Sequence, residues 1–175
     1  SGASIAAQCA SRYPEVALSL IVDEPDWAPW IIELGGQAQL AEFLACVDQP
    51  AAKAMADGDA EGAIRIFVDG VLGAGMYARL SPEMRMVMLD NVPELKVELK
   101  AADTFYSPFS FDDARRIQAP TLLVEGSASL PMYGRVAAKF AECVPNIQRI
   151  LVDGAPHAAH FVTPDRFNEA VLDFL

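Results

Sequence analysis

Histidine and carboxylate side chains at two points of the chain could carry out acid–base chemistry. His157 lies in the segment GAPHAAH, directly after an apolar run that ends at Val152. A histidine in such a turn can serve as general base and then as general acid in hydrolysis. The tripeptide DEP supplies Asp23 and Glu24 at the end of another apolar run. These residue types could form an acid–base centre that acts on a nucleophile on a neighbouring strand.

The elements that must position these side chains are strands alternating with helices. Short apolar runs typical of buried strands occur at residues 16–22, 120–126 and 148–152. Helical patterns occur at residues 4–12, before the first of these runs, and at residues 133–144 and 164–175, after the second and third runs. This alternation predicts an α/β fold with a mostly parallel sheet and right-handed crossovers. Ligand sites in such sheets lie outside the carboxyl ends of the strands, where His157 is expected.

The middle of the chain has a different pattern. Residues 26–118 are predominantly helical, with breaks at glycine and proline, and the segment DAEGAIRIFVDGVLG (residues 59–73) presents an amphipathic face. We predict that residues 26–118 form an inserted helical cap. The core of the fold is then predicted to consist of residues 1–25 and 119–175.

Composition restricts the classes of partner. The chain has 175 residues, of which 53% are hydrophobic, and a formal net charge of −11, which disfavours nucleic acid and anionic membrane surfaces. No apolar run reaches the roughly 20 residues of a membrane span. Cys9, Cys46 and Cys143 lack the spacing of a metal site and are expected to be buried thiols of a cytoplasmic protein. A homodimer is compatible with this composition.

Several segments resemble the α/β-hydrolase family. The opening SGASIAAQCASRYPE resembles the second half of its nucleophile elbow, G-x-S-S-G-A, and PTLLVEG and GAPHAAHFVTPDRFNEAVLDFL resemble later segments. The resemblance covers essentially the whole chain, as a C-terminal portion of the family fold. The most similar branch combines SSGA with H-E-P or D-E-P and includes the lactone-cleaving zearalenone hydrolases. Pro156 stands where the family commonly has glycine.

This resemblance implies roles for individual residues. His157 would be the general base and acid of a catalytic triad. By the family spacing, the nucleophile would be a serine just before Ser1, and the backbone N–H of Ser1 would form half of the oxyanion hole. Ser1 as the nucleophile itself differs from that spacing by one residue.

The acid of the triad has three candidates. The loop after residues 120–126, where most of the family has its acid, reads SASLPMYG and contains no carboxylate. Asp23 and Glu24 are neighbours and cannot both face His157, because side chains alternate along a strand. Parallel strands lie about 4.8 Å apart, so a glutamate can still reach across. The branch with D-E-P implies Glu24, and Asp153 is the remaining rival.

The predicted substrate contacts are mostly apolar. Trp27 and Trp30 follow the acid and are expected to flank a pocket mouth, while Met76 and Tyr77 are expected in an adaptable roof. His160 is expected to be structural or to line the pocket. Ordinary core packing is the alternative for these apolar residues. The pattern favours an uncharged, hydrophobic small molecule as substrate.

The sequence thus predicts a serine hydrolase that cleaves an ester or lactone by a Ser-His-Glu mechanism, with no metal or organic cofactor. Two alternatives remain open. One is a ligand-binding receptor of the same fold with little turnover, and the other is C–C or cyanohydrin cleavage on the same triad.

Overall fold

The structure, a computed structural model, describes residues 2–100 and 108–175. The chain divides into two compact units: unit 1 comprises Ser1–Gly36 and Pro108–Leu175, and unit 2 comprises Gln37–Ser107. Residues 26–36 and 108–118, which the sequence analysis assigned to the cap, therefore group with unit 1. The role of unit 2 as a cap stays a prediction.

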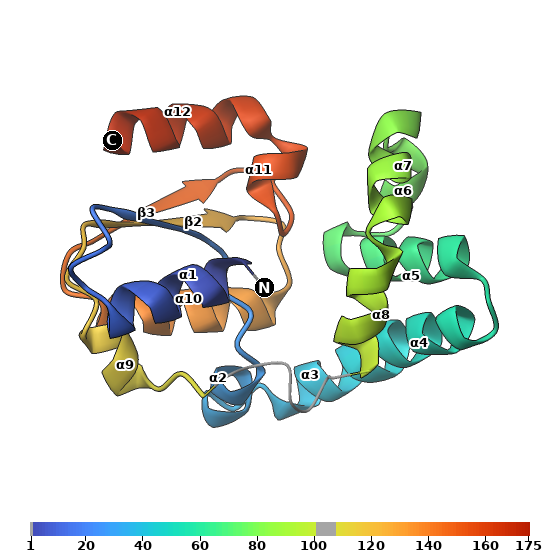
Figure 1. The fold of residues 1–175 in the computed structure, drawn as a ribbon, viewed down its shortest axis with the longest axis horizontal. Helices are drawn as coiled ribbons and strands as arrows, with labels where there is room; N and C mark the ends of the chain where they lie inside the picture. Colours follow the sequence, from blue (N-terminus) through green and yellow to red (C-terminus); the bar gives the residue numbers. More distant parts are fainter. Residues whose placement is uncertain (1, 101–107) are drawn as a thin grey trace. The chain divides into compact units, whose positions relative to one another are not determined.

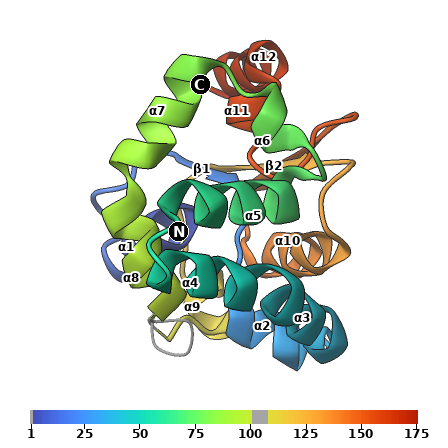
Figure 2. The ribbon, with the colours of Figure 1, turned by 90° about the vertical axis from the view of Figure 1, so that its right-hand side faces the viewer.

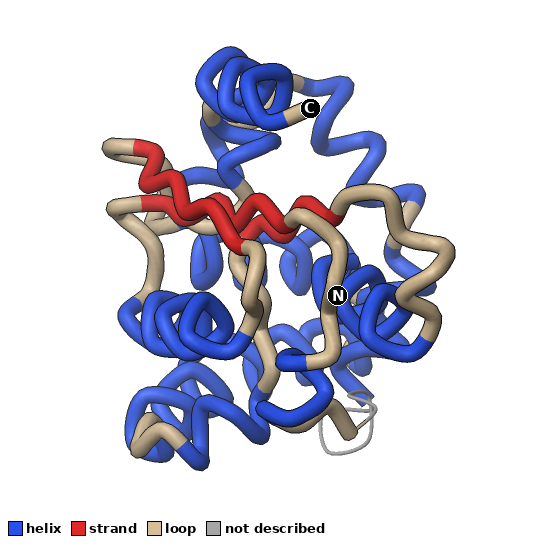
Figure 3. The backbone as a smooth tube through the Cα atoms, turned by 90° about the vertical axis from the view of Figure 1, so that its left-hand side faces the viewer, coloured by secondary structure: helices blue, strands red, loops and turns tan. Residues whose placement is uncertain are grey.

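Unit 1 contains a parallel sheet, drawn in red in Figure 3. Within the described residues the sheet has three strands in the order β1-β2-β3. The strands are β1 (Leu20–Asp23), β2 (Thr121–Gly126) and β3 (Ile147–Val152). Thr121 of β2 lies opposite Leu20 on one side and Ile147 on the other. All three strands therefore end at the same edge of the sheet, which brings the segments after them together.

The first strand is shorter than predicted. It begins at Leu20, whose N–H donates to the carbonyl of Pro120 at 2.9 Å, just before β2 starts. The pairing between β1 and β2 begins at Leu20 and Thr121, so Val16 and Leu18 have no strand of the described sheet beside them. Their side chains are 61% and 91% exposed. The prediction of a buried strand over residues 16–19 is therefore wrong.

Helices cover both faces of this sheet (Figure 1). One face carries α1 (Gly2–Arg12) and α10 (Pro131–Cys143), and the other carries α11 (Ala159–Val162) and α12 (Pro164–Phe174). Fully buried Ala7 lets α1 lie close to the sheet. On the opposite face, Leu122 and Val124 pack in a cluster with Phe167 and Val171 of α12. Unit 1 is thus a three-layer α/β unit.

An aromatic cluster fills the core of unit 1 near α2 (Ala28–Glu33) and α9 (Phe111–Arg115). Trp27 and Trp30 are each 1% exposed, and their ring centroids lie 4.7 Å apart. Phe109 stacks on Trp27, and its carbonyl accepts a 2.6 Å hydrogen bond from the Trp30 indole N–H. Phe140 of α10 joins the cluster. The structure therefore buries both tryptophans in the core, which agrees with the alternative of core packing, and their part in substrate binding stays a prediction.

Unit 2 is helical in its described residues (Figure 2). Its elements are α3 (Gln37–Phe43), the π-helical turn η1 (Leu44–Asp48), α4 (Gln49–Ala56), α5 (Ala60–Leu72), α6 (Met76–Arg79), α7 (Pro82–Asp90) and α8 (Val92–Lys100). The amphipathic face predicted within residues 59–73 is present, since α5 buries Ala63, Ile64 and Val68. At Gly70 an added Cβ would lie 2.4 Å from the Val47 side chain, so glycine permits close packing of α5 on η1.

Asp48 ends the π-helical turn in a partly buried position. Its Oδ1 atom is buried and has no hydrogen-bond partner among the described residues. Burial disfavours the charged carboxylate and raises the pKa of Asp48 from 3.8 to about 6.

Two further features bear on the sequence analysis. Cys9 and Cys46 are exposed and only Cys143 is buried, so the prediction of three buried thiols is wrong for the first two.

Within residues 2–100 and 108–175, the structure has no helix with the length and apolar character needed to cross a membrane.

Candidate active site

The segments that follow β1 and β3 bring Glu24 and His157 into contact. Glu24 comes directly after β1, and His157 lies in the turn after β3. Because both strands run parallel to β2, these segments meet at the carboxyl edge of the sheet. The Nδ1 atom of His157 lies 2.9 Å from Oε2 of Glu24. The histidine side chain is 21% exposed, so one end of this pair is accessible.

The Glu24 carboxylate is buried and surrounded by hydrogen-bond donors. The residue is 2% exposed, and its Oε1 atom accepts a 2.7 Å hydrogen bond from the N–H of Gly126. Its Oε2 atom accepts a hydrogen bond of 2.5 Å from the Ser129 hydroxyl in addition to the contact with His157. The Gly126 N–H and the Ser129 hydroxyl both donate to this buried carboxyl group, which suits its ionised form.

The backbone of Glu24 adopts a rare conformation. Its φ of 41° lies in the left-handed region, which is uncommon for a residue other than glycine, and Pro25 follows it. The Glu24 N–H still donates to the Val124 carbonyl at 3.1 Å, so the turn begins immediately after the last strand contact. Strained backbone of this kind persists where the surroundings hold it and is frequent at functional sites.

The carboxylate fixes the tautomer of His157. An ionised carboxylate can only accept hydrogen bonds, so Nδ1 of His157 must carry the proton in this contact. The Nε2 atom of the neutral ring is then left as a proton acceptor. Tyr133 of α10 stacks on the imidazole with ring centroids 4.4 Å apart and an angle of 28°, which restricts the plane of the ring. The pair can thus act as a general base and then as a general acid.

The other two candidate acids make different contacts. Oδ2 of Asp23 lies 2.6 Å from Nδ1 of His160, a residue whose side chain is 56% exposed. Asp153 accepts a hydrogen bond of 3.2 Å from the Ser127 hydroxyl. Among the described residues, Glu24 is the carboxylate that contacts His157.

Comparisons with known proteins identify the fold. No protein-family model matches the chain. A deep-sea metagenomic α/β-hydrolase enzyme, MGS-M2, superposes with a TM-score of 0.68 at 18% identity over 99% of this chain and 61% of that one. The carboxylesterase CesB from Bacillus subtilis gives 0.67 at 20% identity, covering 99% and 56% of the two chains. Est816, described as an N-acyl homoserine lactone degrading enzyme, gives 0.66 at 21%, covering 99% and 64%. The chain has the α/β-hydrolase fold.

Two curated relatives match shorter parts of the chain. A protein from Synechocystis sp., provisionally named a non-heme chloroperoxidase, is 36% identical over 66 residues, which are 37% of this chain and 24% of that protein. A protein from Azorhizobium caulinodans, provisionally named the carbamate hydrolase RutD, is 35% identical over 92 residues, or 50% and 33%. The matched regions therefore span a quarter to a third of these relatives. The comparisons therefore show the α/β-hydrolase fold, and the activity of the whole protein is a proposal.

The remaining predicted site residues are Ser1, Met76 and Tyr77. Ser1 lies outside the described residues. Met76 and Tyr77 belong to α6 of unit 2, where the Tyr77 hydroxyl donates to Glu61 at 3.1 Å. Burial is the main cause of a raised pKa of Tyr77, and the hydrogen bond to Glu61 adds to it. These contacts account for Tyr77 as a packed residue of unit 2, and its part in substrate binding stays a prediction.

Two residues that contact the pair were missed by the sequence analysis. Ser129 lies in the loop that was set aside because it holds no carboxylate, and Tyr133 was assigned only to a helix. A hydroxyl in a turn at the carboxyl edge of the sheet was the available signal for Ser129. Among the described residues, no group of three His, Cys, Asp or Glu side chains could hold a metal ion.

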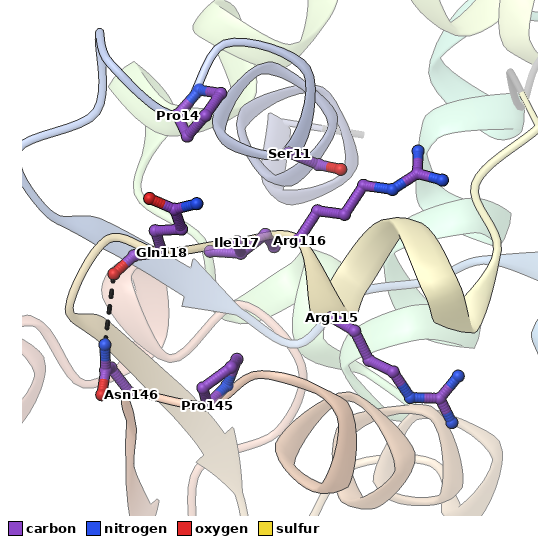
Figure 4. A pocket seen from close by; sticks show the side chains of 8 residues that line it. All are labelled: Ser11, Pro14, Arg115, Arg116, Ile117, Gln118, Pro145 and Asn146. Atoms are coloured by element: carbon purple, nitrogen blue, oxygen red, sulfur yellow. Dashed lines mark hydrogen bonds between the residues drawn. The ribbon is translucent and has the colours of Figure 1, made fainter.

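A hollow of about 610 Å³ lies at the opposite end of the strands (Figure 4). Gln118 and Asn146 line it just before β2 and β3 begin, and the Asn146 amide donates to the Gln118 carbonyl at 3.2 Å. Arg115 and Arg116 also line it, and each forms an ion pair with an aspartate of α9. Since His157 follows the other end of β3, this hollow is distinct from the candidate active site.

Proposed function

We propose that the complete protein is a serine hydrolase that cleaves an uncharged, hydrophobic ester or lactone. The observation that carries the proposal is the 2.9 Å contact between Nδ1 of His157 and the buried carboxylate of Glu24. In this proposal the nucleophile is a serine at the position before Ser1. The backbone N–H of Ser1 contributes to the oxyanion hole.

In the proposed reaction, Nε2 of His157 removes the proton from the serine hydroxyl as the oxygen attacks the carbonyl carbon. The same nitrogen then protonates the leaving alcohol, which leaves an acyl-enzyme, and a water activated by His157 releases the acid. Glu24 stabilises the imidazolium formed in each half and does not take the proton. The reaction requires no metal or organic cofactor.

The choice of substrate has two supports. The structural neighbours include a carboxylesterase and a lactone-degrading enzyme, and the sequence resembles a lactone-cleaving branch. The net charge of −11 disfavours anionic substrates through electrostatic repulsion. Carbamate hydrolysis, named for one curated relative, follows the same acyl-transfer chemistry and is a separate outcome of the test.

The test is a steady-state survey of the complete protein with hydrophobic esters, lactones, carbamates and cyanohydrins. We expect turnover of an ester or lactone, weaker turnover of its carboxylate-bearing analogue, and loss of turnover in His157→Ala. Turnover restricted to carbamates would contradict the substrate class. Full activity in His157→Ala would contradict the mechanism, and tight ligand binding without turnover would indicate a receptor.

A further inference from the structure

We propose that Ser129 is a positioning residue of the active site, which orients the Glu24 carboxylate so that Oε2 faces His157. This inference rests on the proposed function. Ser129 donates its hydroxyl hydrogen bond to Oε2 at 2.5 Å, and His157 contacts the same oxygen at 2.9 Å. A hydroxyl bound to a carboxylate at this distance makes a charge-assisted hydrogen bond, which is stronger than a neutral one.

The hydroxyl is held in place by its own turn. The N–H of Ser129 donates to the carbonyl of Gly126 at 3.2 Å, which closes a tight turn directly after β2. The next hydrogen bonds tie this turn to the segment that carries His157. Ser127 donates to Val152 at 3.1 Å, and Ala128 donates to Ala155 at 2.9 Å, in both cases from backbone N–H to carbonyl.

Close packing removes the remaining freedom of the turn. A Cβ added at Gly126 would lie 2.3 Å from the carbonyl oxygen of Ala155 and 2.6 Å from that of Pro156. The turn and the His157 segment are therefore in direct backbone contact. The N–H of Gly126 donates to Oε1 of Glu24, so this turn supplies donors to both carboxylate oxygens.

The Gly126 N–H and the Ser129 hydroxyl bind different oxygens of the Glu24 carboxylate. The terminal torsion of a glutamate side chain is broad, so a carboxylate held at one oxygen can rotate. With Gly126 on Oε1 and Ser129 on Oε2, that rotation is restricted, and one acceptor direction of Oε2 remains for His157. Ser129 thus acts through Glu24 on the orientation of the imidazole.

The experiment compares Ser129→Ala, Ser129→Thr and Ser127→Ala in the complete protein. Ser127 is the matched control, since it lies in the same turn, but its hydroxyl donates to Asp153 and accepts from the N–H of Gly154 and does not contact Glu24. We expect Ser129→Ala to lower kcat by roughly 10-fold or more, with little change in KM, because a hydrogen bond to a charged group is lost away from the substrate. Ser129→Thr retains the hydroxyl and should restore most of kcat.

Three kinetic results would overturn the inference: unchanged kcat in Ser129→Ala, no rescue by Ser129→Thr, or an equal loss in Ser127→Ala. A second readout needs no substrate. The proton on Nδ1 of His157, hydrogen-bonded to a carboxylate, should give a downfield proton NMR signal that is absent in His157→Ala. We expect this signal to shift in Ser129→Ala and to stay in place in Ser127→Ala. If the complete protein hydrolyses nothing, the proposed function fails, and an unmoved signal in Ser129→Ala separately refutes the positioning role.

Discussion

Glu24→Gln changes the chemistry of the buried pair while keeping its shape. In the structure, Oε1 faces the N–H donor of Gly126, and Oε2 faces the Ser129 hydroxyl and Nδ1 of His157. A glutamine has one amide oxygen and one NH2 group for these two places. Placing the NH2 group toward Gly126 would oppose two donors in a buried site, at a cost of about 1–3 kcal/mol.

The other orientation satisfies every hydrogen bond but disables the base. With the NH2 group in the place of Oε2, the Ser129 hydroxyl can rotate to accept, and Nδ1 of His157 must also accept. The imidazole proton then moves to Nε2, which can no longer remove a proton from a nucleophile. We expect this orientation to dominate, since it leaves no donor unpaired.

The magnitude follows from this change of tautomer. The analogous change in a serine protease triad lowers kcat about 10⁴-fold, which corresponds to roughly 5.5 kcal/mol of transition-state stabilisation. The free energy of unfolding should change by only about 1 kcal/mol, because charged hydrogen bonds become neutral ones without leaving a polar group unpaired. The melting temperature is therefore expected to shift by a few degrees at most.

The assay measures kcat/KM and thermal unfolding of the complete protein and its variants. Asp23→Asn and Asp153→Asn are matched controls, because their carboxylates contact His160 and Ser127 and not His157. We expect both controls to retain most of the activity. If Asp153→Asn or Asp23→Asn lost as much activity as Glu24→Gln while all variants stayed folded, the assignment of the acid would be refuted.

Two further predictions concern Gly126 and Asp48. Gly126→Ala should lower both activity and the free energy of unfolding, the latter by about 1–3 kcal/mol, because the added Cβ would overlap backbone oxygens of the His157 segment. Urea denaturation and kcat measurements check this prediction. The control is Gly134→Ala, whose added Cβ would meet nothing within 4 Å and which should show neither loss. Because the pKa of Asp48 is raised to about 6, the contribution of this residue to stability falls as pH rises from 3.8 through 6, by about 1–2 kcal/mol after allowance for partial exposure. Asp48→Asn removes this contribution, so the variant should gain stability relative to wild type between pH 4 and pH 7 in urea denaturation; a difference that does not depend on pH would contradict the assignment.

The fold could be predicted because its signals are local. The apolar runs at residues 120–126 and 148–152 are bounded by turn residues and occur as β2 and β3. Pro164 marks the first turn of α12, as expected from its fixed φ. The length of β1 could not be obtained in this way, since it depends on where β2 begins. An apolar run such as Val16 to Ser19 contains no information about its neighbour.

The same distinction applies to the candidate site. Glu24 and His157 could be proposed because their residue types suit acid–base chemistry and both follow apolar runs. The position of Trp27 could not be predicted, because Phe109 and Phe140, whose rings pack against it, are distant in sequence. Ser129 was missed for a similar reason. Its contact with Glu24 joins residues 105 positions apart, and a serine in a turn has no local pattern that distinguishes it from a solvated one.

The central claim is that His157 and Glu24 serve a covalent acyl-transfer reaction. Stopped-flow measurement of the complete wild-type protein with a short activated ester tests it most directly, because acylation and deacylation are separate steps. The account predicts a burst of one product equivalent per active site, followed by slower turnover, with both phases lost in His157→Ala. A burst that persists in His157→Ala, or the absence of both burst and turnover in wild type across esters and lactones, would contradict it.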